Sequence, residues 1–430
     1  MSPDSSNPSV DWRARVLDAV DAERTPMLDL LVGLVRTPSI SGSDEENSAQ
    51  ADLARLFERA GLERDHWPLP LAELQGEDDF PGVEVPRTEA WGLVGRLPGR
   101  GSGPTLMLNG HIDVVPPGNL EAWGDAPFAG RLSGGALFGR GACDMKAGLV
   151  AAAWAVQALQ RAAVPLRGDV LLASVQGEED GGLGTYALLR RGWRADACVI
   201  PEPTGLDLVP ATAGALTFRL RVPGRAAHAA RRLAGTSALE KFWPVWRALQ
   251  ELERVRNADV DPLMGRWPLP YALSIGTVRA GDWASSVPDL LVAEGRLGVA
   301  LGEPPAAARA AIEGAVAQAC AEDPWLREHP VTVEWWGGQF ASGRVPTGSD
   351  LPARVRAAHA VVTGGAAQDT WAAPYGSDLR LLTGLGGIPT VHYGPGDAGL
   401  AHGPDEAVPI AEVVTAARAL AVLAVEYCGA

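Results

Sequence analysis

Residues 169–190 read DVLLASVQGEEDGGLGTYALLR, and this stretch indicates the fold class of the chain. The apolar run at 169–175 predicts a buried strand, and the residues at 183–190 predict a short helix. A second apolar run at 197–200 predicts the next strand. Strands that alternate with helices are typical of an α/β fold, in which helices cover both faces of a mostly parallel sheet.

The same alternation continues on both sides of this stretch. Toward the N-terminus it includes a strand at 105–108 and a helix at 146–162. Toward the C-terminus it includes a strand at 389–393 and a closing helix at 411–427. The Pro-rich, acidic stretch at 62–90 carries no such pattern, and we expect it to be irregular.

A different pattern occupies residues 212–340. Its strands and helices follow the order β-α-β-β-α-β, which is typical of a small ferredoxin-like α+β domain. A chain of 430 residues is also longer than a single core usually serves. The sequence therefore predicts a larger α/β domain, formed by residues 1–211 and 341–430, with residues 212–340 inserted between its two parts.

The net charge and the cysteine spacing limit the kinds of binding partner and the cellular compartment that we expect for this protein. The net charge is −15 without a Lys/Arg-rich block, which argues against nucleic acid and against anionic membranes. The apolar run at 149–159 is too short to span a bilayer, and the polar first ten residues lack the apolar stretch of a secretory signal. Because the four cysteines lie far apart, we expect reduced thiols in a cytoplasmic protein.

Side chains able to bind a divalent cation follow four of the predicted strands. They are His111, Asp113, Glu178, Glu179, Glu202 and His402, and Asp144 joins them from a Gly-rich turn. In an open α/β sheet, ligands bind at the carboxyl ends of the strands. Carboxylate oxygens and neutral imidazole nitrogens are ligands of zinc and similar ions. We therefore predict a two-metal hydrolytic site; solvated loop charges are the alternative for each residue alone.

The pair Glu178-Glu179 indicates how such a site could work. Adjacent carboxylates repel each other, so one of them gains stability when a cation holds it, and the other can remain free as a general base. A solvated acidic turn is the alternative. Asp113 follows His111 by two residues on a Pro-bounded turn, which suits a carboxylate that orients the imidazole.

Five segments resemble the metal-dependent family of acetylornithine deacetylase, succinyl-diaminopimelate desuccinylase, aminoacylase and glutamate carboxypeptidase. They are GHIDVVP at 110–116, GRGACDMK at 139–146, GEE at 177–179, PEPT at 201–204 and AHGPDE at 401–406. Their order, their spacing and the inserted domain match this family over nearly the whole chain.

This resemblance implies a role for each motif residue. One metal ion would be held by His111, Asp144 and Glu202. The second would be held by Asp144, Glu179 and His402, so that Asp144 bridges the two ions. The resemblance also makes Glu178 the general base and Asp113 the partner of His111.

The inserted domain also carries marks that resemble the family. The segment GRAAHA at 224–229 resembles a lid whose histidine, here His228, reaches the active site, often from the partner subunit of a dimer. We therefore expect a lid and dimerisation domain, and a homodimer. Ser286 and Arg296 resemble a second lid segment, in which the family usually has Asn at the position of Ser286. Arg296 would then bind a substrate carboxylate. The alternative for Arg296 is an ordinary ion pair. The alternative for His228 is a solvated side chain.

Gly376 and Ser377 precede a predicted helix and could face the substrate. A helix N-cap explains Ser377 equally well. We therefore keep both interpretations for this dipeptide.

The combined hypothesis is a metal-dependent hydrolase that cleaves the amide bond of a small N-acylated amino acid or related carboxylate, similar to acetylornithine deacetylase. A metallo-dipeptidase or carboxypeptidase is the first alternative. A non-catalytic metal-binding protein on the same scaffold is the alternative of another class. The expected cofactors are two divalent ions, for which the ligand types favour zinc, with cobalt or manganese as possible substitutes.

Overall fold

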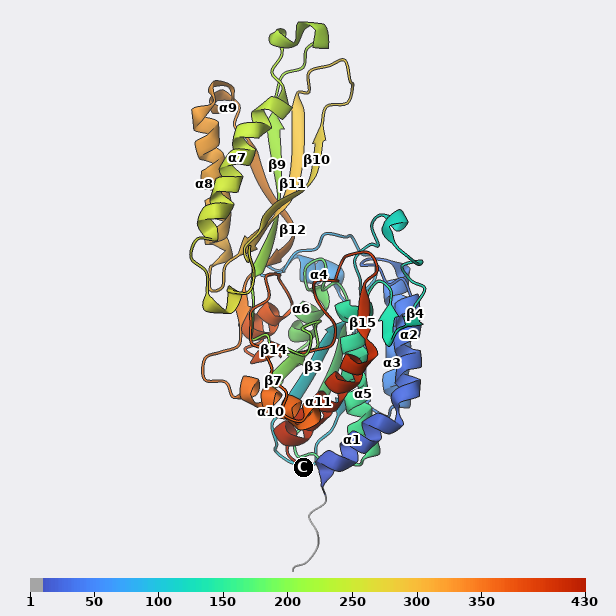
Figure 1. Ribbon diagram of the computed structural model, residues 1–430. Coiled ribbons are helices and arrows are strands. Elements are labelled where there is room, and N and C mark those ends of the chain that lie inside the picture. The colour runs from blue at the N-terminus through green and yellow to red at the C-terminus, as the bar shows by residue number, and fades with distance from the viewer. Residues whose placement is uncertain (1–10) are drawn as a thin grey trace, which may run out of the picture.

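The computed structural model describes residues 11–430, so the expectation based on the polar first ten residues lies mostly outside the described residues. A six-stranded sheet forms the centre of the larger lobe (Figure 1). Its strands, in spatial order, are β1 (Glu63–Pro68), β2 (Trp91–Leu97), β6 (Val170–Val175), β3 (Leu106–His111), β7 (Ala197–Ile200) and β14 (Thr390–His392). The last four are mutually parallel, and near one edge β2 runs antiparallel to both of its neighbours, β1 and β6. The mostly parallel sheet is thus confirmed.

Helices cover both faces of this sheet, as the continuous apolar strands require. One face packs against α1 (Trp12–Ala22), α2 (Arg24–Arg36), α3 (Asp44–Arg59), α5 (Ala147–Arg161), α10 (Leu351–Thr363) and α11 (Ile410–Cys428). The other packs against α4 (Leu71–Gln75), α6 (Leu183–Arg190) and the short helix η5 (Leu381–Leu385). Successive residues of β3 alternate between these two cores: Leu106 and Leu108 join the first, and Met107 joins the second.

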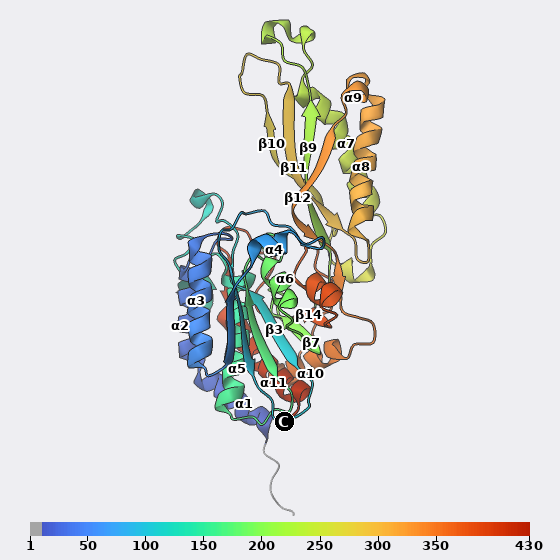
Figure 2. The ribbon, with the colours of Figure 1, turned by 180° about the vertical axis from the view of Figure 1, so that it is seen from behind.

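A second lobe stands beyond the first in both views (Figures 1 and 2). Its antiparallel sheet has the order β10 (Leu273–Ala280), β11 (Leu290–Val299), β9 (Gly214–Pro223) and β12 (Thr332–Phe340). The helices α7 (Ala238–Arg256) and α8 (Pro305–Glu322) pack on this sheet through a shared apolar core. In chain order these elements read β-α-β-β-α-β.

Short elements complete the chain. They are η1 (Leu120–Ala122), β4 (Arg131–Ser133), β5 (Ala136–Phe138), the π-helical turn η2 (Ala142–Lys146), β8 (Ala211–Thr212), η3 (Ala229–Ala234), η4 (Pro262–Met264), α9 (Pro324–Glu328), β13 (Gly343–Arg344) and β15 (Ala407–Pro409). Within residues 11–430, no helix has the length and apolar character needed to cross a membrane.

The stretch at 62–90 is not wholly irregular, so that expectation is wrong for β1 and α4. In β1 only Trp67 is buried, because the strand lies at the edge of the sheet and one of its faces is largely open. Its backbone pairs with β2 along its whole length. Such a strand is stabilised by backbone hydrogen bonds and needs no apolar pattern that a sequence could reveal.

Candidate metal centre

The predicted metal-binding residues lie at the carboxyl end of the parallel strands. His111 is the last residue of β3, Glu178 and Glu179 follow β6, and Glu202 follows β7. Asp144 lies within η2, and His402 lies in the loop between β14 and β15. Since parallel strands end at the same edge, residues far apart in the sequence meet there.

A glycine lets two of these segments approach each other. A Cβ atom added at Gly148, in the first turn of α5, would lie 1.8 Å from the carbonyl oxygen of Pro201. Any larger residue would push α5 away from the chain that leads to Glu202. Gly148 therefore helps to bring Glu202 close to Asp144.

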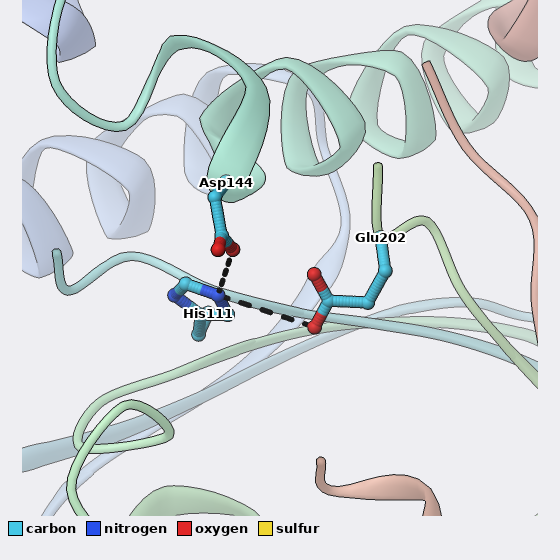
Figure 3. Close-up of side chains that lie close together, drawn as sticks. All are labelled: His111, Asp144 and Glu202. Carbon is cyan, nitrogen blue, oxygen red and sulfur yellow. Dashed lines mark hydrogen bonds and ion pairs between the residues drawn. The ribbon is translucent and has the colours of Figure 1, made fainter. Parts of the chain in front are cut away.

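The first cluster contains His111, Asp144 and Glu202, which point toward one another in Figure 3. The Nε2 atom of His111 lies 3.1 Å from Oδ1 of Asp144 and 4.0 Å from Oε1 of Glu202. The opposite ring atom, Nδ1, lies 2.8 Å from the carbonyl oxygen of Asp113 and donates to it. This contact fixes the ring and turns Nε2 toward the two carboxylates.

The second cluster contains Asp144, Glu179 and His402. The Nε2 atom of His402 lies 3.1 Å from Oε2 of Glu179 and 3.4 Å from Oδ2 of Asp144. The two oxygens of Asp144 thus face two different histidines. The side chain of His402 is 54% exposed whereas that of Glu179 is 8% exposed, so the cluster opens to solvent on the His402 side.

Electrostatics indicate that this donor set fits cations. Burial alone would lower the pKa of His111, yet Asp144 and Glu202 raise it well above its ordinary value. The carboxylate of Glu179 raises the pKa of His402 to about 11. The carboxylates therefore favour a positive charge at each Nε2 position. A divalent ion bound by oxygen and imidazole nitrogen ligands supplies that charge, so the residues fit a metal centre.

Glu178 lies beside the two clusters without belonging to either. Its burial raises its pKa well above the ordinary value, and nearby His111 acts in the opposite direction. Asp113 fixes the backbone here, because its carboxylate accepts hydrogen bonds of 3.3 Å from the backbone N–H groups of both Glu178 and Glu179. The hydroxyl of Ser41 also donates to Asp113, at 2.8 Å. The carboxylate of Asp113 thus holds the loop that carries Glu178 and Glu179, while its carbonyl oxygen accepts from the imidazole of His111.

A cavity of about 190 Å³ adjoins the clusters. The described residues that line it are Asp144, Glu178, Glu179, Glu202, Pro203, Tyr375, Gly376, Ser377, Ala398, Ala401 and His402. This lining contains no Lys or Arg side chain. Permanently charged Lys and Arg side chains therefore do not neutralise the carboxylates from the cavity wall, and only His402 or a bound cation can do so there.

Gly376 and Ser377 do line this cavity, but the hydroxyl of Ser377 is already engaged. It lies 2.9 Å from Nε2 of the buried His392 and accepts a 3.1 Å hydrogen bond from the backbone N–H of Leu379. Burial lowers the pKa of His392 to about 3, so this ring is neutral. The contact with Leu379 is of the kind that the N-cap interpretation of Ser377 expects, while both residues still contribute to the wall.

The three predicted residues of the second lobe do not line the cavity. Arg296, on β11, makes no ion pair with any described residue, and its Nη2 donates to the carbonyl oxygen of Pro374 at 3.3 Å. His228 is exposed and pairs with Ser286 through a β-bridge. It directly precedes η3, which lies at the far end of the second lobe, at the top of Figure 1.

Two further residues at the site were not identified from the sequence. The buried carboxylate of Glu406 pairs with Arg140 at 2.6 Å and accepts hydrogen bonds from the backbone N–H groups of Cys143 and Asp144. Its place in the segment 401–406 was an available signal. Tyr375 lines the cavity beside Gly376, and no sequence pattern marks it.

Comparisons with known proteins agree with this geometry. The model of peptidase family M20/M25/M40 matches residues 107–426. The N-formyl-4-amino-5-aminomethyl-2-methylpyrimidine deformylase of Bacillus subtilis is 27% identical, and the match covers 95% of this chain and 96% of that protein. The succinyl-diaminopimelate desuccinylase of Gluconacetobacter diazotrophicus is 34% identical over 63% of this chain and 66% of that protein.

A solved structure extends the likeness to both lobes. The di-peptidase Dug1p of Saccharomyces cerevisiae superposes with a TM-score of 0.75 and covers 97% of this chain and 98% of its own. Its sequence is 16% identical, so the likeness concerns the fold alone.

Proposed function

Since this chain belongs to peptidase family M20/M25/M40, and is a metal-dependent hydrolase of amide bonds, we propose that it removes a small acyl group from a small N-acylated amino acid or related carboxylate. The observation that carries the proposal is the position of Asp144, whose two oxygens face two histidines next to the buried Glu178. The relatives that are named deformylase and desuccinylase also favour removal of an acyl group.

We propose that His111, Asp144 and Glu202 hold one divalent ion, and that Asp144, Glu179 and His402 hold the other. Zinc suits these ligands, with cobalt or manganese as substitutes. When bound, the ions supply Lewis-acid polarisation of the amide carbonyl and make water more acidic.

The proposed role of Glu178 is to take a proton from the attacking water and to return one to the leaving amine. Asp113 holds the backbone of Glu178 in place, which limits the freedom of this carboxylate. A positioned acid–base group of this kind contributes ~10²–10⁴-fold to the rate.

The proposed domain boundaries follow the sequence: residues 1–211 and 341–430 form the catalytic domain, and residues 212–340 form an inserted lid and dimerisation domain. Arg296 supports a substrate role for this lid, because its guanidinium is without a carboxylate partner among the described residues. His228 is exposed and remote from the cavity of its own chain, which favours its reaching the cavity of a second copy in a homodimer. There, together with Ser286, it would contact the substrate.

The compartment is also part of the proposal. All four cysteines are buried and free. Free thiols suit a reducing compartment, so we propose that the enzyme works in the cytoplasm.

A substrate panel tests the proposed reaction. The protein is stripped with a chelator, reloaded with zinc, cobalt or manganese, and supplied with the N-formyl, N-acetyl and N-succinyl derivatives of alanine and with the dipeptide Ala-Ala. We expect chelator-sensitive release of the acyl acid from at least one derivative. Cleavage of the dipeptide alone would favour the peptidase alternative. Full metal loading without hydrolysis of any compound would contradict an amide hydrolase for these substrates.

A further inference from the structure

Tyr375 lines the metal cavity, and its buried hydroxyl has no hydrogen-bond partner among the described residues. Buried tyrosine hydroxyls usually find a partner, because leaving one without any is unfavourable. Such an unpaired group inside a candidate active site points to a partner that arrives with the substrate.

Contacts on both sides hold the backbone around Tyr375. On the N-terminal side, the carbonyl oxygen of Ala372 accepts from the indole N–H of Trp267 at 2.8 Å, and that of Pro374 accepts from Arg296 at 3.3 Å. On the C-terminal side, Ser377 is tied to His392. The phenol is therefore held on a fixed segment, which suits a group that must meet a reacting atom in a defined position.

The surrounding chemistry decides which substrate atom the hydroxyl can meet. The cavity wall offers many acceptor oxygens, from Glu178, Glu202 and neighbouring carboxylates, and few free donors. The hydroxyl of Ser377 is engaged by His392, and His228 of the same chain does not line the cavity. Burial raises the pKa of Tyr375 above the ordinary value of a phenol, so the hydroxyl keeps its proton at neutral pH and can donate it. A carbonyl oxygen, which only accepts, is the complementary group on an amide substrate.

We propose that Tyr375 is a catalytic residue that donates a hydrogen bond to the carbonyl oxygen of the substrate amide and to the tetrahedral oxyanion that forms from it. This inference rests on the proposed amide hydrolysis, and it adds a residue to it. The hydrogen bond strengthens as negative charge develops on that oxygen. No proton leaves the phenol, and Glu178 keeps the acid–base role.

The experiment compares Tyr375→Phe with Tyr393→Phe. Both changes remove a single buried hydroxyl, but that of Tyr393 lies outside the cavity and contacts Nδ1 of His359 at 3.0 Å. The probe is methylphosphonate, a tetrahedral anion that mimics the adduct of an acetyl group, with acetate as its planar counterpart. Binding of each to the zinc-loaded proteins is measured by calorimetry, and kcat and KM are measured on N-acetylalanine and N-formylalanine.

We expect Tyr375→Phe to weaken methylphosphonate binding by roughly tenfold or more, as for a lost hydrogen bond to a charged group, and to change acetate binding less. It should lower kcat by ~10²–10³-fold with little change in KM, as for removal of one oxyanion donor. The zinc content should be unchanged, and the melting temperature should not fall, because the folded protein loses no hydrogen bond and no longer buries an unpaired hydroxyl. Tyr393→Phe should lower the melting temperature. Its methylphosphonate affinity should stay within about twofold of the wild-type value, a much smaller change in binding free energy than the tenfold loss expected for Tyr375→Phe.

Equal methylphosphonate affinity in the wild type and Tyr375→Phe would overturn the role of Tyr375, as would a wild type that does not bind this anion. If the wild type hydrolyses a substrate and Tyr375→Phe has the same kcat, the inference fails while the proposed function stands. If methylphosphonate binding depends on Tyr375 but the wild type hydrolyses neither substrate, the proposed acyl preference fails while the donor role of Tyr375 stands.

Discussion

Replacing Arg87 by methionine should destabilise the fold and loosen the loop that carries Glu178. The side chain of Arg87 is 2% exposed and pairs with two buried carboxylates, Glu46 at 3.1 Å and Asp180 at 2.8 Å. Glu46 also accepts a 3.0 Å hydrogen bond from the backbone N–H of Gly177, and Asp180 accepts from the N–H groups of residues 84 and 85. Arg87 thus connects both ends of the segment 177–180 to the rest of the larger lobe.

The expected loss of unfolding free energy is ~3–5 kcal/mol, the usual cost of removing one partner from a buried ion pair. The loss should depend on pH. Burial raises the pKa of Glu46 to about 7, and Arg87 opposes that rise, so the pKa should be higher still in Arg87→Met. Between its unfolded pKa near 4.5 and its folded value, Glu46 binds more protons in the folded state, so stability falls as the pH rises. The variant should therefore lose less stability at pH 5 than at pH 8.

Urea unfolding of metal-free protein at the two pH values measures this effect. Arg254→Met is the matched control, because Arg254 pairs with Glu251 on the surface of α7, and each side chain is at least 60% exposed. That change should alter the free energy of unfolding far less than Arg87→Met does, as is typical of exposed pairs. If Arg87→Met were as stable as the control, or lost more stability at pH 5 than at pH 8, our account of this buried network would be refuted.

Three other substitutions test separate roles. Glu178→Gln should keep its metal content and lose ~10²–10⁴-fold in kcat, and near-normal turnover would remove Glu178 from the base role. His228→Ala should also bind metal normally and should have a lower kcat. If His228 acts across a dimer, mixing this variant with Glu178→Gln should restore part of the activity. No recovery of activity would contradict that arrangement. Arg296→Leu should raise KM by ~10-fold or more for N-acyl amino acids, as for a lost hydrogen bond to a charged group. It should change KM less for N-acylamines without a carboxylate, because these substrates lose only the contact of Arg296 with Pro374. Equal effects on both substrate classes would exclude carboxylate binding.

The central strands were predictable because both of their faces are covered. The run expected at 169–175 is β6 (Val170–Val175), and the helix expected at 183–190 is α6 (Leu183–Arg190). A strand buried on both faces must be apolar throughout, so its sequence reveals it. The edge strand β1 has no such requirement, and its polar sequence concealed it.

The candidate site was predictable where residues follow strands, and was missed where only packing places them. The spacing of His111, Glu178 and Glu202 after three parallel strands indicated that these side chains would meet, although their roles remain predictions. Tyr375 follows no strand of the central sheet, and its proposed role arises from an unpaired hydroxyl in a residue that packs beside carboxylates from distant segments of the chain. A sequence does not show which buried hydroxyl lacks a partner.

The sharing of Asp144 between two metal ions is the central claim, and metal analysis of Asp144→Asn tests it most directly. The amide keeps the size of the side chain but removes its charge and one of its acceptor oxygens. After reloading with zinc and removal of excess metal, we expect Asp144→Asn to bind less than the wild type at both sites, whereas the exposed control Asp125→Asn should bind two equivalents. Two full equivalents in Asp144→Asn, bound as tightly as in the wild type, would contradict the bridge.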